Sequence, residues 1–148
     1  MKGHIDLGIR RIKMYRHTVR YYETDKMGIT HHSNYIRWME EARIAFLKEK
    51  GFDYARLENE GIYSPVINIS CQYIRPTTFP DDIDIDVTVK AFNGVKLTLM
   101  YRMYKADTPV CQSESMHCFL DKSGKPIRLK KSFPEFYDML TDNIKESR

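Results

Sequence analysis

The sequence has few cysteines and no long apolar run, and both absences limit what the protein can be. Three cysteines occur in 148 residues, Cys71, Cys111 and Cys118, and no two of them form a CxxC pair. This spacing favours small buried thiols within strands over a metal site or a disulfide framework. No stretch approaches the roughly 20 apolar residues that a membrane span requires, and the first residues lack the apolar segment of a signal peptide. We therefore expect a cytoplasmic protein without a membrane span.

A strong excess of charge of one sign is also missing. Lys and Arg number 24 and Asp and Glu number 20, so the formal net charge is only +4. The basic residues are interleaved with acidic ones, and no recognised nucleic-acid-reading module is present. Repeats and low-complexity tracts are absent as well. With 42% hydrophobic residues, the chain is expected to form one domain with an ordinary core and to have no nucleic-acid partner.

The first residues are expected to form an N-terminal extension over 1–13. They include Arg10, Arg11 and Lys13 and show little hydrophobic periodicity, which indicates a basic arm that orders against a partner subunit. A single domain over 14–148 is expected to follow. No function is assigned to the extension.

Hydrophobic periodicity predicts a strand followed by a long helix. β-prone residues predict the strand over Met14–Tyr22, and a glycine-containing turn comes next. The helix is expected from about Asn34 to Lys50, because Gly51 is a typical residue just after a helix end. Its wide apolar stripe indicates packing against a sheet and consists of Trp38, Met39, Ala42, Phe46 and Leu47.

Alternating patterns predict a meander of further strands. A half-buried strand is expected through Ile67–Tyr73, and Asn93-Gly94 predicts a hairpin between strands at Ile83–Val89 and Val95–Met103. A last strand is expected over Val110–Leu120, with short helices at 54–60 and 134–141. This order predicts an α+β fold in which about five antiparallel strands carry a long helix on one face.

The segment Tyr21–Tyr35 contains the residues best suited to chemistry. It brings the acid Asp25 and the imidazole of His32 to the start of the long helix, where Ser33 or Asn34 can serve as the cap. The first helical turn has free N–H groups and the positive end of the dipole, which suit a carbonyl oxygen that gains negative charge. Glu23 and Thr24, beside them, are expected to be turn residues that face solvent.

Simpler interpretations of the same residues stay open at this point. An aspartate near a helix start is commonly a capping residue, and Tyr21 on a strand is commonly a packing aromatic. His31 and His32 beside an acid suggest a metal, but the sequence shows no third or fourth ligand. No metal and no cofactor are therefore expected.

In combination, these residues resemble the hotdog-fold acyl-CoA thioesterases, and among them the 4-hydroxybenzoyl-CoA thioesterase and YbgC-like branch. The resemblance covers about residues 14 to 137 and rests on Tyr21, Asp25, Gly28, His32, Asn34, Tyr35 and Tyr73-Ile74-Arg75-Pro76. It implies a long central helix wrapped by a curved antiparallel sheet. It also implies a homodimer that joins two sheets edge to edge, with active sites between subunits, or a homotetramer made of two such dimers.

The resemblance also implies residue roles. Asp25 matches the family's catalytic carboxylate, either a general base or a nucleophile, and His32 stands where a backbone N–H at the helix start meets the thioester oxygen. Tyr21 and His32 match a Tyr and a His that accompany the acid. Arg128 matches an arginine that holds the nucleotide of coenzyme A, and Lys130 and Lys96 are the other basic candidates. The basic run that holds Arg128, Lys130 and Lys131 is, in most proteins, a solvated segment.

The expected function is therefore hydrolysis of an acyl-CoA thioester to a free acid and coenzyme A, which is part of the substrate and not a cofactor. A thioesterase that acts on acyl carrier protein is the nearest alternative. A hotdog domain that binds acyl-CoA or a partner protein without turnover is the alternative from another class.

Overall fold

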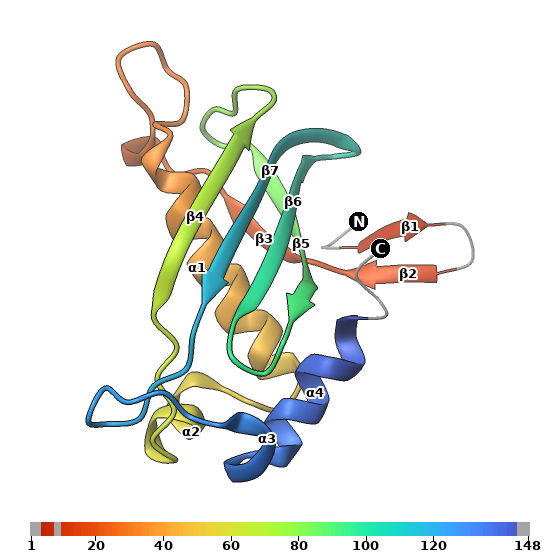
Figure 1. The fold of residues 1–148 in the computed structure, drawn as a ribbon. Helices are drawn as coiled ribbons and strands as arrows, with labels where there is room; N and C mark the ends of the chain where they lie inside the picture. The colour runs from red at the N-terminus through yellow and green to blue at the C-terminus, as the bar shows by residue number, and fades with distance from the viewer. Residues whose placement is uncertain (1–3, 8–9, 145–148) are drawn as a thin grey trace. The chain divides into compact units, whose positions relative to one another are not determined.

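A computed structural model describes residues 4–7 and 10–144 (Figure 1). Within the predicted N-terminal extension, β1 (His4–Leu7) pairs with β2 (Arg10–Lys13) as an antiparallel ladder in which His4 is opposite Lys13. Residues 1–3 and 8–9 of the extension, and 145–148 of the predicted domain, lie outside the described residues. The boundary predicted after residue 13 stays a prediction.

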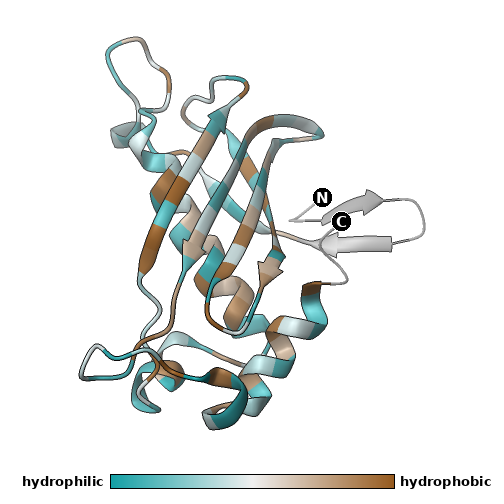
Figure 2. Cartoon of the chain, viewed as in Figure 1, coloured by the Kyte–Doolittle hydropathy of each residue, from teal (hydrophilic) through white to brown (hydrophobic). Residues whose placement is uncertain are grey.

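The main sheet has five strands in the order β3-β5-β6-β7-β4 (Figure 1). In chain order these strands are β3 (Tyr15–Thr18), β4 (Val66–Tyr73), β5 (Asp82–Phe92), β6 (Leu97–Lys105) and β7 (Thr108–His117). Apolar and polar residues alternate along several of these strands (Figure 2), as expected for strands with one buried face. The predicted α+β class with about five antiparallel strands is confirmed.

The chain divides into two compact units. The first comprises residues 1–43, 71–87 and 101–113, and the second comprises 44–70, 88–100 and 114–148. Helix α1 (Ser33–Glu49) and strands β4 to β7 contribute residues to both units.

In the first unit, β3 is shorter than the sequence predicts. The N–H of Val19 donates to the carbonyl of Asp81 at 2.8 Å, and the chain then enters a 3-10 turn, η1 (Tyr21–Glu23). Tyr21 therefore lies in a turn, and the predicted strand through Tyr22 was too long. Within β3, Arg16 binds the carboxylate of Asp84 on β5, with Nε and Oδ1 2.8 Å apart, which ties the two strands together.

Helix α1 begins and ends within one residue of its predicted limits. Gly51 has a φ of 94°, and the N–H of Phe52 donates to the carbonyl of Leu47 at 2.8 Å, so the helix ends in a left-handed glycine cap. Of the predicted stripe, Trp38, Met39, Ala42 and Leu47 are buried and Phe46 is partly buried. In the first unit, the Trp38 ring lies 4.7 Å from the ring of His17 on β3.

The second unit contains the turn of the predicted hairpin and three short helices. The Oδ1 of Asn93 accepts the N–H groups of Val95 and Lys96, and Gly94 has a φ of 90°, so the predicted turn is confirmed. The helices are α2 (Tyr54–Asn59), α3 (Leu129–Ser132) and α4 (Pro134–Ile144). Helix α3 forms within the basic segment, where the sequence predicted no helix.

Strand β4 is more exposed than predicted. Its side chains Val66, Ile67 and Tyr73 are 42%, 45% and 46% exposed, whereas Cys71 is partly buried. Figure 2 shows that the strand nevertheless carries apolar residues. The prediction of a half-buried strand is therefore wrong for Ile67 and Tyr73, because an edge strand has a sheet neighbour on one side only and less of the chain to pack against.

Candidate active site

The turn between η1 and α1 is closed by its own backbone. The N–H of Asp25 donates to the carbonyl of Ile29 at 2.8 Å, and the N–H of Gly28 donates back to the carbonyl of Asp25 at 2.9 Å. Gly28 has a φ of 80°, a conformation that residues with a Cβ rarely adopt. The Asp25 Oδ1 accepts the N–H of Met27 at 2.8 Å, which is an Asx turn. The position of Asp25 is therefore set by the turn that contains it.

The base of this turn is anchored to the segment at Thr77. The Thr30 N–H donates to the carbonyl of Thr77 at 2.8 Å, and the two threonine hydroxyls lie 2.6 Å apart. The hydroxyl of Tyr35, in the first turn of α1, lies 2.9 Å from the Thr77 Oγ1. Thr77 therefore links the turn and the start of the helix.

Asp25 and His32 line the same cavity, of about 310 Å³. The sequence predicted that these two residues lie together, and the structure brings them together. The remaining wall comes from the same turn, from Tyr35 and from the end of β4 with the residues after it. These residues are Ile29, Thr30, Tyr35, Tyr73, Ile74, Arg75 and Pro76.

The start of α1 offers a polarising group at this cavity. Among the described residues, the backbone N–H of His32 has no hydrogen-bond acceptor. The Tyr73 hydroxyl donates to the His32 carbonyl at 3.2 Å, which holds the next peptide unit, between His32 and Ser33, in place. An N–H group at the positive end of a helix, aimed at a substrate carbonyl, stabilises the negative charge that develops on its oxygen.

The predicted capping residues serve a different purpose. The Asn34 amide donates to the carbonyls of Glu23 at 3.0 Å and His31 at 3.2 Å. The Ser33 hydroxyl lies 2.9 Å from the Nδ1 of His31, and the Ser33 N–H donates to the same nitrogen at 3.3 Å. Asn34 therefore joins the helix start to the turn, and the His31 ring occupies the capping position.

The phenols in the cavity wall stay protonated near neutral pH. Burial raises the pKa of Tyr35, and the hydrogen bond with Thr77 only partly opposes this effect. Burial and a hydrogen bond with Cys71 raise the pKa of Tyr73. Besides these phenols, the residues that line the cavity supply one carboxyl group, from Asp25, one guanidinium, from Arg75, and one imidazole, from His32.

Tyr21 lies away from this cavity. Its side chain is 76% exposed, and its ring makes an edge contact with Phe79 at a centroid distance of 5.8 Å. The structure therefore does not place Tyr21 with Asp25 and His32, and its predicted catalytic role stays a prediction.

Glu23 is the residue that the sequence analysis misplaced. It was expected to face solvent, yet it is only 5% exposed, and its carboxylate accepts hydrogen bonds from two side chains and one backbone group. The donors are the His17 Nε2 at 2.9 Å, the Trp38 Nε1 at 3.0 Å and the Arg20 N–H at 2.8 Å. The available signal was Trp38 itself, because a buried indole N–H requires an acceptor.

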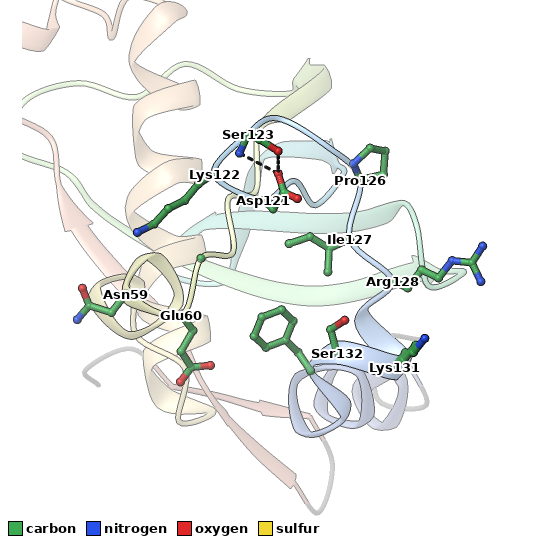
Figure 3. Close-up of a pocket in the computed structure, with 12 residues that line it drawn as sticks. Asn59, Glu60, Asp121, Lys122, Ser123, Pro126, Ile127, Arg128, Lys131 and Ser132 are labelled. Carbon is green, nitrogen blue, oxygen red and sulfur yellow. Dashed lines mark hydrogen bonds between the residues drawn. The ribbon is translucent and has the colours of Figure 1, made fainter.

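The predicted coenzyme A residues lie in the second unit, and Arg128 lines a larger cavity of about 770 Å³ (Figure 3). Lys131, which belongs to the same predicted basic run, lines it too, and so does Lys122, which was not singled out from the sequence. In Figure 3, the Arg128 and Lys131 side chains extend toward the same side, and the Asp121 carboxylate is bound by Ser123. Hydrogen bonds from Ser123 and Lys125 hold the pKa of Asp121 below its usual value, so this acid stays charged.

Lys130 and Lys96 do not line that cavity. The Lys130 Nζ is 5.8 Å from the centroid of the Tyr137 ring, a cation–π distance. Lys96 belongs to the β5–β6 turn, and a Cβ placed on Gly94 in the same turn would lie 3.7 Å from the Tyr137 Cε2. The Lys130 ammonium group and the turn that carries Lys96 therefore both approach the Tyr137 ring, whereas of the three predicted basic residues only Arg128 lines the cavity.

Two further predictions concern metals and membranes. Within the part of the chain that the structure describes, no group of three or more His, Cys, Asp or Glu side chains is placed to hold a metal ion. Across the same residues, no helix is both long enough and apolar enough to cross a membrane.

Comparison with known proteins gives one family and several close relatives. The family model of the thioesterase-like superfamily matches residues 19–142, which include the whole of the cavity with Asp25. The putative acyl-CoA thioesterase YneP of Bacillus subtilis is 38% identical over 121 residues, which cover 80% of this chain and 88% of that protein. The acyl-CoA thioester hydrolase YbgC of Escherichia coli is 28% identical over 123 residues, which cover 80% of this chain and 92% of that protein.

The fold has a matching solved structure. The crystal structure of a DHNA-CoA thioesterase from Staphylococcus aureus superposes with a TM-score of 0.83 at 27% identity. The superposition covers 87% of this chain and 88% of that one.

Proposed function

Because the chain belongs to the thioesterase-like superfamily, we propose that it hydrolyses an acyl-CoA thioester with the Asp25 carboxylate and the start of helix α1. Membership confirms the predicted hotdog-fold family and the class of thioester hydrolase. The residue-level mechanism is our inference. The observation that carries it is the single cavity of about 310 Å³ that Asp25 and His32 share.

The thioester carbonyl would lie with its oxygen at the free N–H of His32. As a nucleophile attacks the carbonyl carbon, charge accumulates on this oxygen, and the N–H stabilises the transition state more than the ground state. The bond from carbon to sulfur then breaks, and coenzyme A leaves as the thiolate, which takes up a proton. The remaining requirement is an oxygen nucleophile, and Asp25 is the carboxylate in reach.

Asp25 has the freedom that this role requires. It is exposed, and among the described residues its carboxylate accepts only the Met27 N–H, through Oδ1. It can therefore deprotonate a water that attacks the carbonyl carbon. Alternatively, it attacks directly and forms a mixed anhydride, which water then opens to the free acid. In either route, the His32 imidazole at the same cavity can donate a hydrogen bond to the leaving sulfur or to the water.

The test is the rate of free-thiol release from a panel of acyl-CoA substrates by the wild-type protein and by Asp25→Asn. The Asn side chain still accepts the Met27 N–H, so the turn is kept while the charge and basicity are lost. We expect kcat to fall by about two orders of magnitude or more. The control Asp107→Asn changes an exposed acid in another turn and should leave the rate unchanged. Thiol release at the uncatalysed background rate by both proteins would support the non-catalytic binding domain instead, and equal rates above background would exclude Asp25 from the mechanism.

The second part of the proposal assigns the phosphates of coenzyme A to the cavity at Arg128. Arg128 and Lys131 present two cations on one side of this cavity, and guanidinium groups bind phosphate with paired hydrogen bonds (Figure 3). We expect Arg128→Ala to weaken coenzyme A binding by about three- to tenfold at low salt, the range for an exposed charged hydrogen bond. The loss should shrink at higher salt, because ions screen the attraction between Arg128 and the phosphates in the wild type.

Lys125→Ala is the matched control for Arg128→Ala. Lys125 is an exposed cation close to Arg128 in the chain that does not line the cavity. If calorimetric titration with coenzyme A gives the same affinity and the same salt dependence for both variants, the phosphates bind elsewhere.

The third part of the proposal is a homodimer formed through β4. This strand is at one end of the main sheet, and it exposes the apolar side chains Val66, Ile67 and Tyr73. An exposed apolar edge favours pairing with another strand, and a second copy of the same strand is a self-complementary partner. Sedimentation equilibrium should give a dimer, or a tetramer of paired dimers. A monomer at micromolar concentration contradicts this part alone.

A further inference from the structure

Glu23 is a buried acid two residues before Asp25, and the proposed reaction does not use it. Burying a carboxylate is unfavourable unless hydrogen bonds or an opposite charge compensate for the lost water. Here the compensation is nearly complete, because both oxygens of Glu23 accept hydrogen bonds from His17, Trp38 and the Arg20 N–H. His17 comes from β3 and Trp38 from α1. One side chain therefore connects the strand, the turn and the helix.

The backbone of Glu23 connects the same turn to the helix start. Its carbonyl accepts the N–H of His31 at 2.8 Å and the side-chain amide of Asn34 at 3.0 Å. The two acceptor groups of Glu23 thus have different partners. The side-chain carboxylate is bound by His17 and Trp38, and the backbone carbonyl is bound by His31 and Asn34, which flank His32 and Ser33. Any shift of Glu23 would move Asp25 relative to the His32 N–H.

We propose that Glu23 is a positioning residue that sets the distance between the Asp25 carboxylate and the start of α1. The inference rests on the proposed function, because it needs Asp25 as the reacting acid. Glu23 does not line the cavity that contains Asp25 and His32. It lines another cavity of the first unit, of about 530 Å³, together with His17 and Glu41. It therefore acts through the backbone of the turn and does not touch the thioester.

A purely structural role of Glu23 would give a different result when the residue is replaced. If Glu23 only stabilised the fold, its replacement would lower the folded fraction and leave the turnover of each folded molecule unchanged. If Glu23 positions Asp25, the folded molecules themselves turn over more slowly, and the effect depends on the presence of Asp25. A double-mutant cycle between these two residues separates the two roles.

The experiment measures kcat and KM for one acyl-CoA with four proteins: wild type, Glu23→Gln, Asp25→Asn and the double variant. Assays are run well below the melting temperature, with the folded state checked by circular dichroism. We expect Glu23→Gln to lower kcat by about tenfold or more and to change KM by less than about twofold. A misplaced Asp25 carboxylate would reduce the stabilisation of the transition state much more than it would reduce substrate binding. In the Asp25→Asn background, Glu23→Gln should have no further effect on kcat.

Glu41→Gln is the matched control. Glu41 lies 3.3 Å from the other nitrogen of His17, so it is the same kind of acid in the same cluster, but among the described residues its hydrogen-bond and ion-pair partners are His17 and Tyr15, outside the turn. Its kcat should equal that of wild type. If Glu23→Gln does not fold, Trp38→Phe replaces it in the cycle, because it removes the indole donor and leaves Glu23 in place. We expect Trp38→Phe to lower kcat by about threefold, and again only when Asp25 is present.

The possible failures are distinguishable. If Asp25→Asn turns over like wild type, the proposed function is wrong. If Asp25→Asn is slow but Glu23→Gln keeps the wild-type kcat, only the positioning role is wrong. An equal fall in kcat from Glu23→Gln in both backgrounds also overturns positioning, because the effect would then be independent of Asp25.

Discussion

The Tyr21–Tyr35 turn has one carboxylate on its buried side and one on its exposed side, and the two differ in the number of hydrogen bonds that they accept. On the buried side, Glu23 is 5% exposed and accepts hydrogen bonds from His17, Trp38 and the Arg20 N–H. On the exposed side, Asp25 accepts one backbone N–H, from Met27. A buried carboxylate with hydrogen bonds to both oxygens holds structure, whereas an exposed one that accepts a single hydrogen bond can take a proton or attack a carbon.

This contrast assigns rigidity and reactivity to neighbouring residues. A buried carboxylate is favourable only where its donors are in place, so Glu23 stabilises one geometry of the turn against others. Only two peptide bonds separate Asp25 from Glu23, so the same interactions fix the backbone of Asp25. Its own carboxylate stays available for reaction. The comparison therefore predicts that the two acids differ in which quantity they control: Glu23 should control stability as well as turnover, and Asp25 turnover alone.

The largest expected effect is on stability. In Glu23→Gln, the buried N–H of His17 or of Trp38 faces the new side-chain NH2 group and loses its acceptor. We expect this variant to lower the free energy of unfolding by about 2 to 4 kcal/mol. Asp25→Asn keeps the exposed Asx turn, and we expect a change within about 0.5 kcal/mol. Urea unfolding followed by Trp38 fluorescence measures both values. Equal losses of unfolding free energy in the two variants would contradict the distinction between Glu23 as the structural acid and Asp25 as the reacting acid.

A smaller effect is expected from pH. Burial alone raises the pKa of Glu23, but the hydrogen bonds from His17, Trp38 and Arg20 outweigh it, so the pKa lies below the usual 4.5. The folded state then releases the proton more readily than the unfolded state, and this contribution to stability is fully present above pH 4.5. It is lost as the pH falls through the lower folded value. The other titratable groups facing this acid are His17 and, beyond it, Glu41 and Tyr15.

The measurement is the difference in unfolding free energy between wild type and Glu23→Gln, followed from neutral to acidic pH. The difference should be largest near neutrality and shrink below pH 4.5, because the variant has no proton to take up at this position. The gap between wild type and Asp25→Asn serves as the control and should stay small throughout. A gap for Glu23→Gln that grows toward acid would mean that the carboxyl group is already protonated in the native state.

Local signals were sufficient for much of the fold and for the exposed side of the site. Helix α1 was predictable because an apolar stripe and Gly51 act within a few residues, and the β5–β6 hairpin because Asn93-Gly94 determines its own turn. Asp25 and His32 were predicted together because both belong to one turn and one helix start.

The buried side could not be predicted in the same way. Whether Glu23 faces solvent depends on His17 and Trp38, which are 6 and 15 residues away, and polarity alone favours exposure. The exposure of β4 likewise depends on its being the outermost strand, a property of the sheet order and not of its alternating sequence. Contacts of this kind are set by the tertiary fold, which a pattern within a short segment does not encode.

The smallest effect is expected at Tyr21, and it tests whether the exposed side of the turn extends beyond Asp25. The Tyr21 side chain is 76% exposed, and its ring contacts Phe79, a contact that a Phe would keep. We therefore expect Tyr21→Phe to change kcat/KM by less than about twofold. Tyr73→Phe is the reference, because it removes the hydroxyl that binds the His32 carbonyl at 3.2 Å, and it should lower kcat more. A tenfold or greater loss in Tyr21→Phe would show that this phenol reaches the substrate, and the reacting surface would then include η1 as well as the cavity at Asp25.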